Sequence, residues 1–136
     1  MSAPPIAVGV VLAAGIGSRV GADGNKAYLQ LAGRSMVAWS VAAVAAGPQI
    51  ARTILVFRRG ERDQVAALMA DELPGTTVEF VEGGDTRHGS EHNVLSYLAA
   101  DIEAGTVDVV LIHDAARPLA GADLMDTAVT TARERG

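Results

Sequence analysis

The sequence predicts a three-layer α/β/α fold built on a doubly wound, mainly parallel sheet. Apolar runs of strand length, rich in β-branched residues, lie at residues 6–14, 53–57, 77–81 and 107–112. Segments with helical periodicity alternate with these runs, at residues 35–46, 61–73, 90–100 and 121–135. Because right-handed crossovers between parallel strands place helices on both faces of a sheet, the alternation predicts an α/β fold.

The ends of the first two predicted helices carry ordinary start and stop signals. Ser35 is a residue type that caps helix N-termini, and Gly47 and Pro48 follow the last apolar position of that helix. Pro74 and Gly75 end the second helix in the same way. The predicted boundaries therefore rest on chain chemistry as well as on periodicity.

Composition predicts one domain, residues 1–136, with an aliphatic core. The chain is 49% hydrophobic but only 4% aromatic, which suits the Val-, Ile- and Leu-rich strands of a parallel sheet. A net charge of −5 argues against general binding to nucleic acid or to an anionic membrane. The absence of cysteine excludes disulfides and thiolate metal sites. With no basic signal-peptide region at the N-terminus, we expect a cytoplasmic protein.

Unusual sequence collects where three of the four predicted strands end. AAGIGSRVGADGNK follows the first strand, EGGDTRHGS the third and HDAARP the fourth. In doubly wound sheets, ligands bind outside the carboxyl ends of the strands, near the point where the strand order reverses. The three loops are therefore expected to form one site.

The first of these loops is a candidate for binding phosphate. Backbone N–H groups of residues 15–18 can surround an anion, and Arg19 and Lys26 supply a planar and a mobile cation. Two cations on one loop suit a triphosphate. The alternatives are that Arg19 is a solvated charge and that Lys26 pairs with Asp23.

Two familiar glycine motifs fit this loop poorly. The pattern is G-x-G-x-x-x-G rather than the G-x-G-x-x-G of dinucleotide-binding folds, and the next predicted helix begins only near Ser35. Arg58 and Arg59 stand where an acidic residue is expected, which leaves a 2′-phosphate ligand such as NADP open. A P-loop requires Ser or Thr after its lysine, whereas Ala27 follows Lys26.

Taken together, the three loops resemble the 2-C-methyl-D-erythritol 4-phosphate cytidylyltransferases of the non-mevalonate isoprenoid pathway. L-A-A-G-x-G-x-R with a following lysine, GGDTR with Ser90 three residues on, and HDAARP occur in this order across essentially the whole chain. The first motif alone indicates the wider nucleotidyltransferase class, whereas HDAARP is narrow. The resemblance implies a Rossmann-like nucleotidyltransferase fold, the substrates CTP and a polyol phosphate, and Mg²⁺.

The resemblance also assigns roles to individual residues. Arg19 and Lys26 match the catalytic cations at the phosphates, and Gly84, Asp85 and Ser90 match positions that help hold cytosine. The residues that lie along the cytidine nucleotide would be Ala13, Ala14, Gly15, Ile16, Gly17 and Ser18.

The HDAARP motif supplies the remaining predicted groups. Asp114 and Ala115 match positions near the ribose and the metal-bound phosphates, so Asp114 is the candidate metal ligand, and Arg117 matches a position facing the polyol phosphate. A carboxylate at a strand end beside a triphosphate is a suitable Mg²⁺ partner. The alternatives are that Asp114 caps the next turn or pairs with Arg117.

The histidines receive no catalytic assignment. His88 and His92 lie four residues apart, as helical metal ligands do, but the sequence offers no clear third ligand. We expect His113 to orient the scaffold rather than to act as a base.

The implied reaction is attack of the acceptor phosphate on the α-phosphorus of CTP, with release of pyrophosphate. The attacking phosphate is already ionised at neutral pH, so the protein's task is to position two polyanions and to stabilise charge at the α-phosphate.

Two departures from the family pattern affect these expectations. Asn25 precedes Lys26 where the family usually has proline, so the loop is expected to be less rigid. Family members also continue beyond this length, into a portion with acceptor residues and the arm that builds their homodimer, so dimerisation of this chain is not assured. Alternative functions are a cytidylyltransferase for another polyol phosphate, such as ribitol 5-phosphate, and a nucleotide-binding fragment without catalysis.

Overall fold

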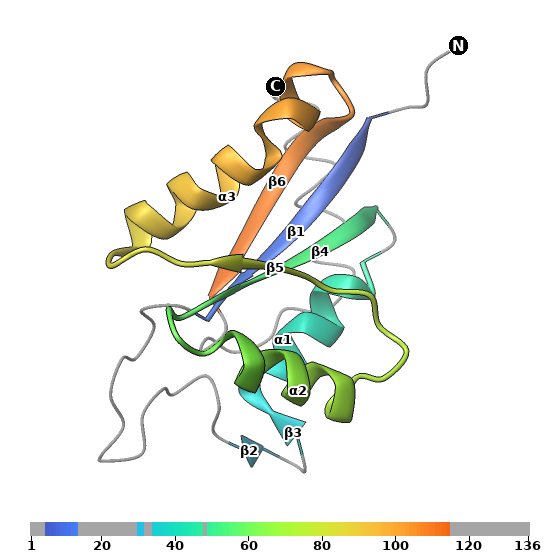
Figure 1. The fold of residues 1–136 in the computed structure, drawn as a ribbon. Helices are drawn as coiled ribbons and strands as arrows, with labels where there is room; N and C mark the ends of the chain where they lie inside the picture. The colour runs from blue at the N-terminus through green and yellow to red at the C-terminus, as the bar shows by residue number, and fades with distance from the viewer. Residues whose placement is uncertain (1–4, 14–29, 32–33, 48, 115–136) are drawn as a thin grey trace.

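The fold is taken from a computed structural model that describes residues 5–13, 30–31, 34–47 and 49–114 (Figure 1). The elements, in chain order, are β1 (Ile6–Leu12), β2 (Gln30–Leu31), β3 (Arg34–Ser35), α1 (Met36–Ala45), β4 (Ile50–Phe57), α2 (Arg62–Glu72), β5 (Glu79–Glu82), α3 (Arg87–Glu103) and β6 (Val107–Asp114).

Four of the strands form one parallel sheet in the order β5-β4-β1-β6. From β1 the chain moves outward to β4 and β5, and then returns to place β6 on the other side of β1. The strand order therefore reverses between β1 and β6, as in doubly wound folds. The predicted fold class is confirmed.

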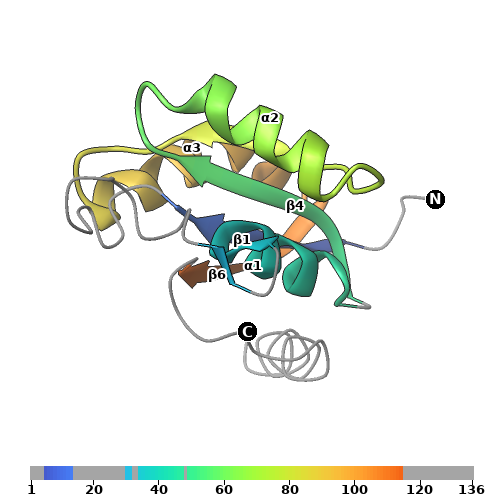
Figure 2. The same cartoon turned by 90° about the horizontal axis from the view of Figure 1, so that it is seen from below.

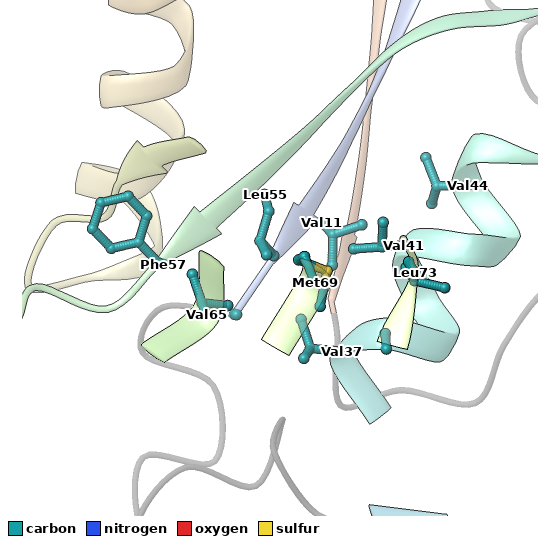
Figure 3. Close-up of a cluster of buried hydrophobic side chains, with 11 residues drawn as sticks. Val11, Val37, Val41, Val44, Leu55, Phe57, Val65, Met69 and Leu73 are labelled. Carbon is teal, nitrogen blue, oxygen red and sulfur yellow. The ribbon is translucent and has the colours of Figure 1, made fainter. Parts of the chain in front are cut away.

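Helices cover both faces of this sheet. Figure 1 shows α3 on the opposite side of the sheet from α1 and α2, and Figure 2 shows the same layers from below. Side chains alternate across each strand, so Val11 and Leu55 pack with α1 and α2, whereas Val10 and Ile54 pack with α3. In Figure 3, Val11 and Leu55 lie among side chains from both helices of the first face. The core is largely aliphatic, as composition predicts.

Several predicted boundaries differ from the observed ones by two or three residues. Helix α3 begins at Arg87, three residues before the predicted start, because Thr86 caps it by accepting a hydrogen bond from the Gly89 N–H at 3.0 Å. Strand β1 ends at Leu12, two residues early, and β4 begins at Ile50, three residues early. The helix predicted at residues 121–135 lies outside the described residues.

A short antiparallel pair was missed by sequence reasoning. Strands β2 and β3 pair Gln30 with Ser35 and Leu31 with Arg34 just before α1. Two-residue strands carry too little alternation to be detected from periodicity.

Ser35 caps α1 as predicted and also joins two helices. Its Oγ accepts from the Ala38 N–H at 3.2 Å, while its own N–H and hydroxyl donate to Oε1 of Glu72, at 2.8 and 3.1 Å. Ser35 is fully buried. The N-terminal end of α1 is thus joined to the C-terminal end of α2 by a side chain 37 positions further along the chain.

Helix α1 approaches β1 closely at Gly9. A Cβ added at Gly9 would collide with Cγ1 of Val44 and lie 3.2 Å from Cγ2 of Ile50. Val44 is 2% exposed, so its side chain has no solvent-facing space to enter. We expect Gly9→Ala to lower the free energy of unfolding by about 1 to 3 kcal/mol through overpacking, as measured by urea denaturation.

Gly75→Ala is the matched control for that variant. No heavy atom lies within 4 Å of a Cβ added at Gly75, so its stability should stay within roughly 0.5 kcal/mol of the parent. Equal effects of the two substitutions would show that the contact between β1 and α1 yields without cost.

An ionic cluster near the amino-terminal ends of the strands connects β4, β5 and α3. Arg52 donates to both carboxylate oxygens of Glu79, at 2.8 and 2.6 Å, and to Asp101 at 3.2 Å. The Tyr97 hydroxyl donates to the same Glu79 at 2.8 Å. The hydrogen bond from Arg52 lowers the pKa of Glu79, and the hydrogen bond to Glu79 raises the pKa of Tyr97.

These shifts predict how stability depends on pH. A carboxyl whose pKa is lowered on folding stabilises the fold above its unfolded value of 4.5, and that contribution is lost as pH falls through the lowered pKa. A tyrosine whose pKa is raised stabilises the fold below pH 10.0 and loses its contribution as pH rises through the raised value. Urea denaturation should show Arg52→Met less stable by about 1 to 2 kcal/mol at pH 7, with a smaller deficit at pH 3. Tyr97→Phe should remove the alkaline loss and change the acid loss less than Arg52→Met does, because the Tyr97 hydroxyl is a smaller cause of the lowered Glu79 pKa than Arg52. Unchanged pH profiles in both variants would contradict the assignment.

Candidate active site

The switch point between β1 and β6 places the first residues of two predicted motifs side by side. In the parallel register, Leu12 is the partner of Asp114 and Val11 is the partner of His113. The glycine loop leaves β1 immediately after this pair, and HDAARP begins on the β6 side of it. Segments about 100 residues apart in sequence therefore start from neighbouring strand ends, as the site prediction requires.

Ala13 joins the end of β1 to the core. Its side chain is fully buried, and its N–H donates to the carbonyl of Val56 at 2.9 Å. The side chain belongs to the hydrophobic cluster beneath the sheet edge. Any contact between Ala13 and a nucleotide would accordingly come from its backbone.

The predicted cytosine-binding residues lie together after the carboxyl end of β5, which is two strands away from β1 in the sheet. Gly83 extends the sheet by donating to the Phe57 carbonyl at 2.8 Å, and the Gly84 N–H donates to Oγ of Ser90 at 3.0 Å. Ser90 is 1% exposed and lies in the first turn of α3. Gly84 and Ser90 are therefore in direct contact, and the Ser90 oxygen shapes the loop.

Gly84 leaves no room for a side chain. A Cβ at this position would lie 2.9 Å from the carbonyl carbon of Gly89 and 3.2 Å from the Ser90 N, both in the backbone of α3. Asp85 differs completely, because its side chain is 92% exposed. The loop thus presents a close-packed glycine beside a solvent-facing carboxylate.

Arg59 is a residue of this edge that sequence reasoning assigned differently. Its Nε lies 3.4 Å from Oε2 of Glu82, and its Nη1 lies 4.0 Å from Oδ1 of Asp85. Sequence reasoning considered Arg59 only as a partner for a 2′-phosphate. The sequence did contain a signal for this contact. Carboxylates flank the two glycines after β5, and an arginine follows β4, the strand beside it.

Several predicted positions lie outside the described residues. They are Ala14, Gly15, Ile16, Gly17, Ser18, Arg19, Lys26, Ala115 and Arg117. The backbone of Asp114 is described as the last residue of β6. The roles of all these side chains stay predictions.

His88 and His92 lie on α3 and are exposed, and residues 5–13, 30–31, 34–47 and 49–114 contain no group of three metal-ligating side chains. Among the helices described here, none combines the length and the apolar character needed to cross a bilayer.

Two surface pockets lie at opposite ends of strands β4 and β5. One of about 350 Å³ lies at the amino-terminal edge of the sheet, where Arg52 and Glu79 contribute to its lining, and it is remote from the three motifs. Another of about 520 Å³ lies at the carboxyl ends of β4 and β5, with Phe57, Phe80 and Glu82 in its wall. Only the second adjoins the predicted cytosine loop.

A parallel sheet that is covered by helices on both faces and whose strand order reverses between β1 and β6 defines the class as a doubly wound α/β domain. The family model of the 2-C-methyl-D-erythritol 4-phosphate cytidylyltransferases (IspD) matches residues 7–136. The chain belongs to this family.

Curated relatives agree with that assignment. A 2-C-methyl-D-erythritol 4-phosphate cytidylyltransferase of Cereibacter sphaeroides is 41% identical over 119 residues, covering 85% of this chain and 49% of the relative. One of Gloeobacter violaceus is 42% identical over 118 residues, covering 86% of this chain and 48% of the relative. The chain therefore spans about half the length of the curated relatives it matches.

Solved structures show the same fold. A 4-diphosphocytidyl-2C-methyl-D-erythritol synthase from Anaerococcus prevotii superimposes with a TM-score of 0.75 at 24% identity, covering 96% of this chain and 52% of that one. CMP:2-keto-3-deoxy-manno-octonic acid synthetase, solved with CTP, gives a TM-score of 0.66 at 12% identity, covering 95% of this chain and 48% of that one.

Proposed function

We propose that this chain carries the CTP-binding half of an enzyme that transfers CMP from CTP to 2-C-methyl-D-erythritol 4-phosphate and releases pyrophosphate. The observation that carries the proposal is the pairing of Leu12 with Asp114, which starts the glycine loop and HDAARP from adjacent strand ends. Family membership over residues 7–136 supports the choice of reaction.

In this proposal, two loops of the chain bind different parts of CTP. The loop after β1 would receive the triphosphate through its backbone N–H groups, with Arg19 and Lys26 stabilising charge at the α-phosphate. The loop after β5 would receive cytosine, since a hydrogen bond of 3.0 Å from the Gly84 N–H to Ser90 Oγ holds these two residues together there. A pocket closed by backbone on one side favours a pyrimidine over a larger purine.

The end of β6 fits Mg²⁺ chemically. This ion is usually held by one or two carboxylates together with substrate phosphates and water, and Asp114 places one carboxylate-bearing residue beside the end of β1. When bound, Mg²⁺ would neutralise phosphate charge. Asp114→Asn should therefore weaken Mg²⁺-dependent CTP binding.

Pyrophosphate release in the presence of CTP and Mg²⁺ tests the function. Release with 2-C-methyl-D-erythritol 4-phosphate supports the proposal, whereas release only with ribitol 5-phosphate identifies a different acceptor. Calorimetric binding of CTP without product would identify a nucleotide-binding module without catalysis. No CTP binding at all would refute the proposal. A homodimer and a cytoplasmic location stay predictions, which sedimentation and fractionation would test.

A further inference from the structure

The loop at residues 83–86 is well anchored at its base. Gly83 donates to the Phe57 carbonyl at 2.8 Å, and the side-chain amide of Asn93 donates to the Glu82 carbonyl at 3.0 Å. The two carboxylates flanking the glycines, Glu82 and Asp85, are by contrast 53% and 92% exposed. They lie beside the place where a nucleotide with several negative charges is proposed to bind.

Arg59 reaches these carboxylates from a different segment. It lies in a tight turn after β4, in which Glu61 donates to the Arg58 carbonyl at 2.9 Å and Gly60 has a φ of 88°. Since Phe57 pairs with Glu82 in the sheet, the turn stands directly beside the loop. The guanidinium consequently lies 3.4 Å from Glu82 and 4.0 Å from Asp85.

The exposure of Arg59 limits how much its ion pairs with Glu82 and Asp85 can stabilise the fold. Arg59 is 68% exposed, and ion pairs between exposed groups contribute little to folding stability. Two uncompensated carboxylates at the cytosine end of the proposed site would nevertheless repel a ligand that carries a triphosphate, and that repulsion is screened by salt. The expected effect of Arg59 is therefore on nucleotide binding and loop position rather than on the fold.

We propose that Arg59 is a positioning residue that holds the loop at residues 83–86 against the turn at residues 58–61 and neutralises Glu82 and Asp85. The charge part of this inference rests on the proposed function, since it requires an anionic nucleotide at this edge. The positioning part concerns the free protein.

The first experiment measures loop exchange and CTP affinity in Arg59→Ala, with Arg62→Ala as the matched control. Arg62 is exposed and lies three positions later, so its loss removes the same charge from the same region. Amide hydrogen exchange near Asp85 should quicken about 3- to 10-fold in Arg59→Ala alone. Its CTP dissociation constant should rise about 3- to 10-fold at low salt and approach the parent value at high salt, with turnover changed less than about twofold.

A second variant separates charge cancellation from a general loss of positive charge. Adding Glu82→Gln to Arg59→Ala should restore much of the CTP affinity, because one repelling carboxylate is removed. Equal effects of Arg59→Ala and Arg62→Ala on affinity, or no recovery in the double variant, would overturn the charge role. Unchanged exchange near Asp85 would overturn the positioning role. If the parent chain binds no CTP, the proposed function fails, and the exchange experiment still decides the positioning role.

Discussion

The Lys26→Ala variant is expected to lose turnover about 30- to 1000-fold, while its CTP affinity falls much less. The lost stabilisation corresponds to roughly 2 to 4 kcal/mol of barrier, as for other preorganised donors aimed at developing charge. Lys26 is the single lysine of the sequence and is proposed to face the α-phosphate. Initial rates of pyrophosphate release and calorimetric CTP binding measure the two effects separately.

The ratio of the two losses decides the role of Lys26. A cation that acts mainly in the transition state lowers kcat, whereas one that only anchors the substrate weakens binding and the rate together. Equal losses would therefore reduce Lys26 to an anchor. Asp23→Asn serves as a control, because it removes the alternative partner of Lys26 and should leave turnover close to that of the parent.

Gly84→Ala is expected to weaken CTP binding by about 30-fold, or roughly 2 kcal/mol. The added Cβ would lie 2.9 Å from the backbone of Gly89, and backbone in the first turn of α3 cannot yield as a flexible side chain does. The loop must then move away from α3, which lengthens the 3.0 Å hydrogen bond from Gly84 to Ser90. CTP titration with the purified variant measures the effect.

Two controls make the Gly84 result specific. Gly75→Ala adds the same methyl group where no heavy atom lies within 4 Å, so it should leave CTP binding unchanged. Ser90→Ala keeps the space at Gly84 but removes the acceptor for its N–H, and should weaken CTP binding less than Gly84→Ala. If Gly84→Ala binds CTP as the parent does, the loop after β5 is not part of the nucleotide site.

The sequence predicted the kind and order of the main strands and helices more accurately than their ends. The family resemblance pointed to Gly84 and Ser90, and the structure joins these two residues by a hydrogen bond of 3.0 Å, while their role in binding cytosine stays a prediction. The start of α3 was misplaced because Gly89 is a poor helix residue, and its effect was offset by the Thr86 cap. Local propensity misled where a single side-chain hydrogen bond decided the outcome.

The sequence alone determined the fold class, the loops at the strand ends and the family resemblance, because periodicity and motif spacing are properties of short segments. The order of the strands, and with it the pairing of Leu12 with Asp114, was established by tertiary structure. So were the contacts of Arg59 with Glu82 and Asp85 and of Arg52 with Glu79 and Asp101. These partners lie far apart in sequence, and their pairing depends on which strands and helices pack side by side, which no local pattern encodes.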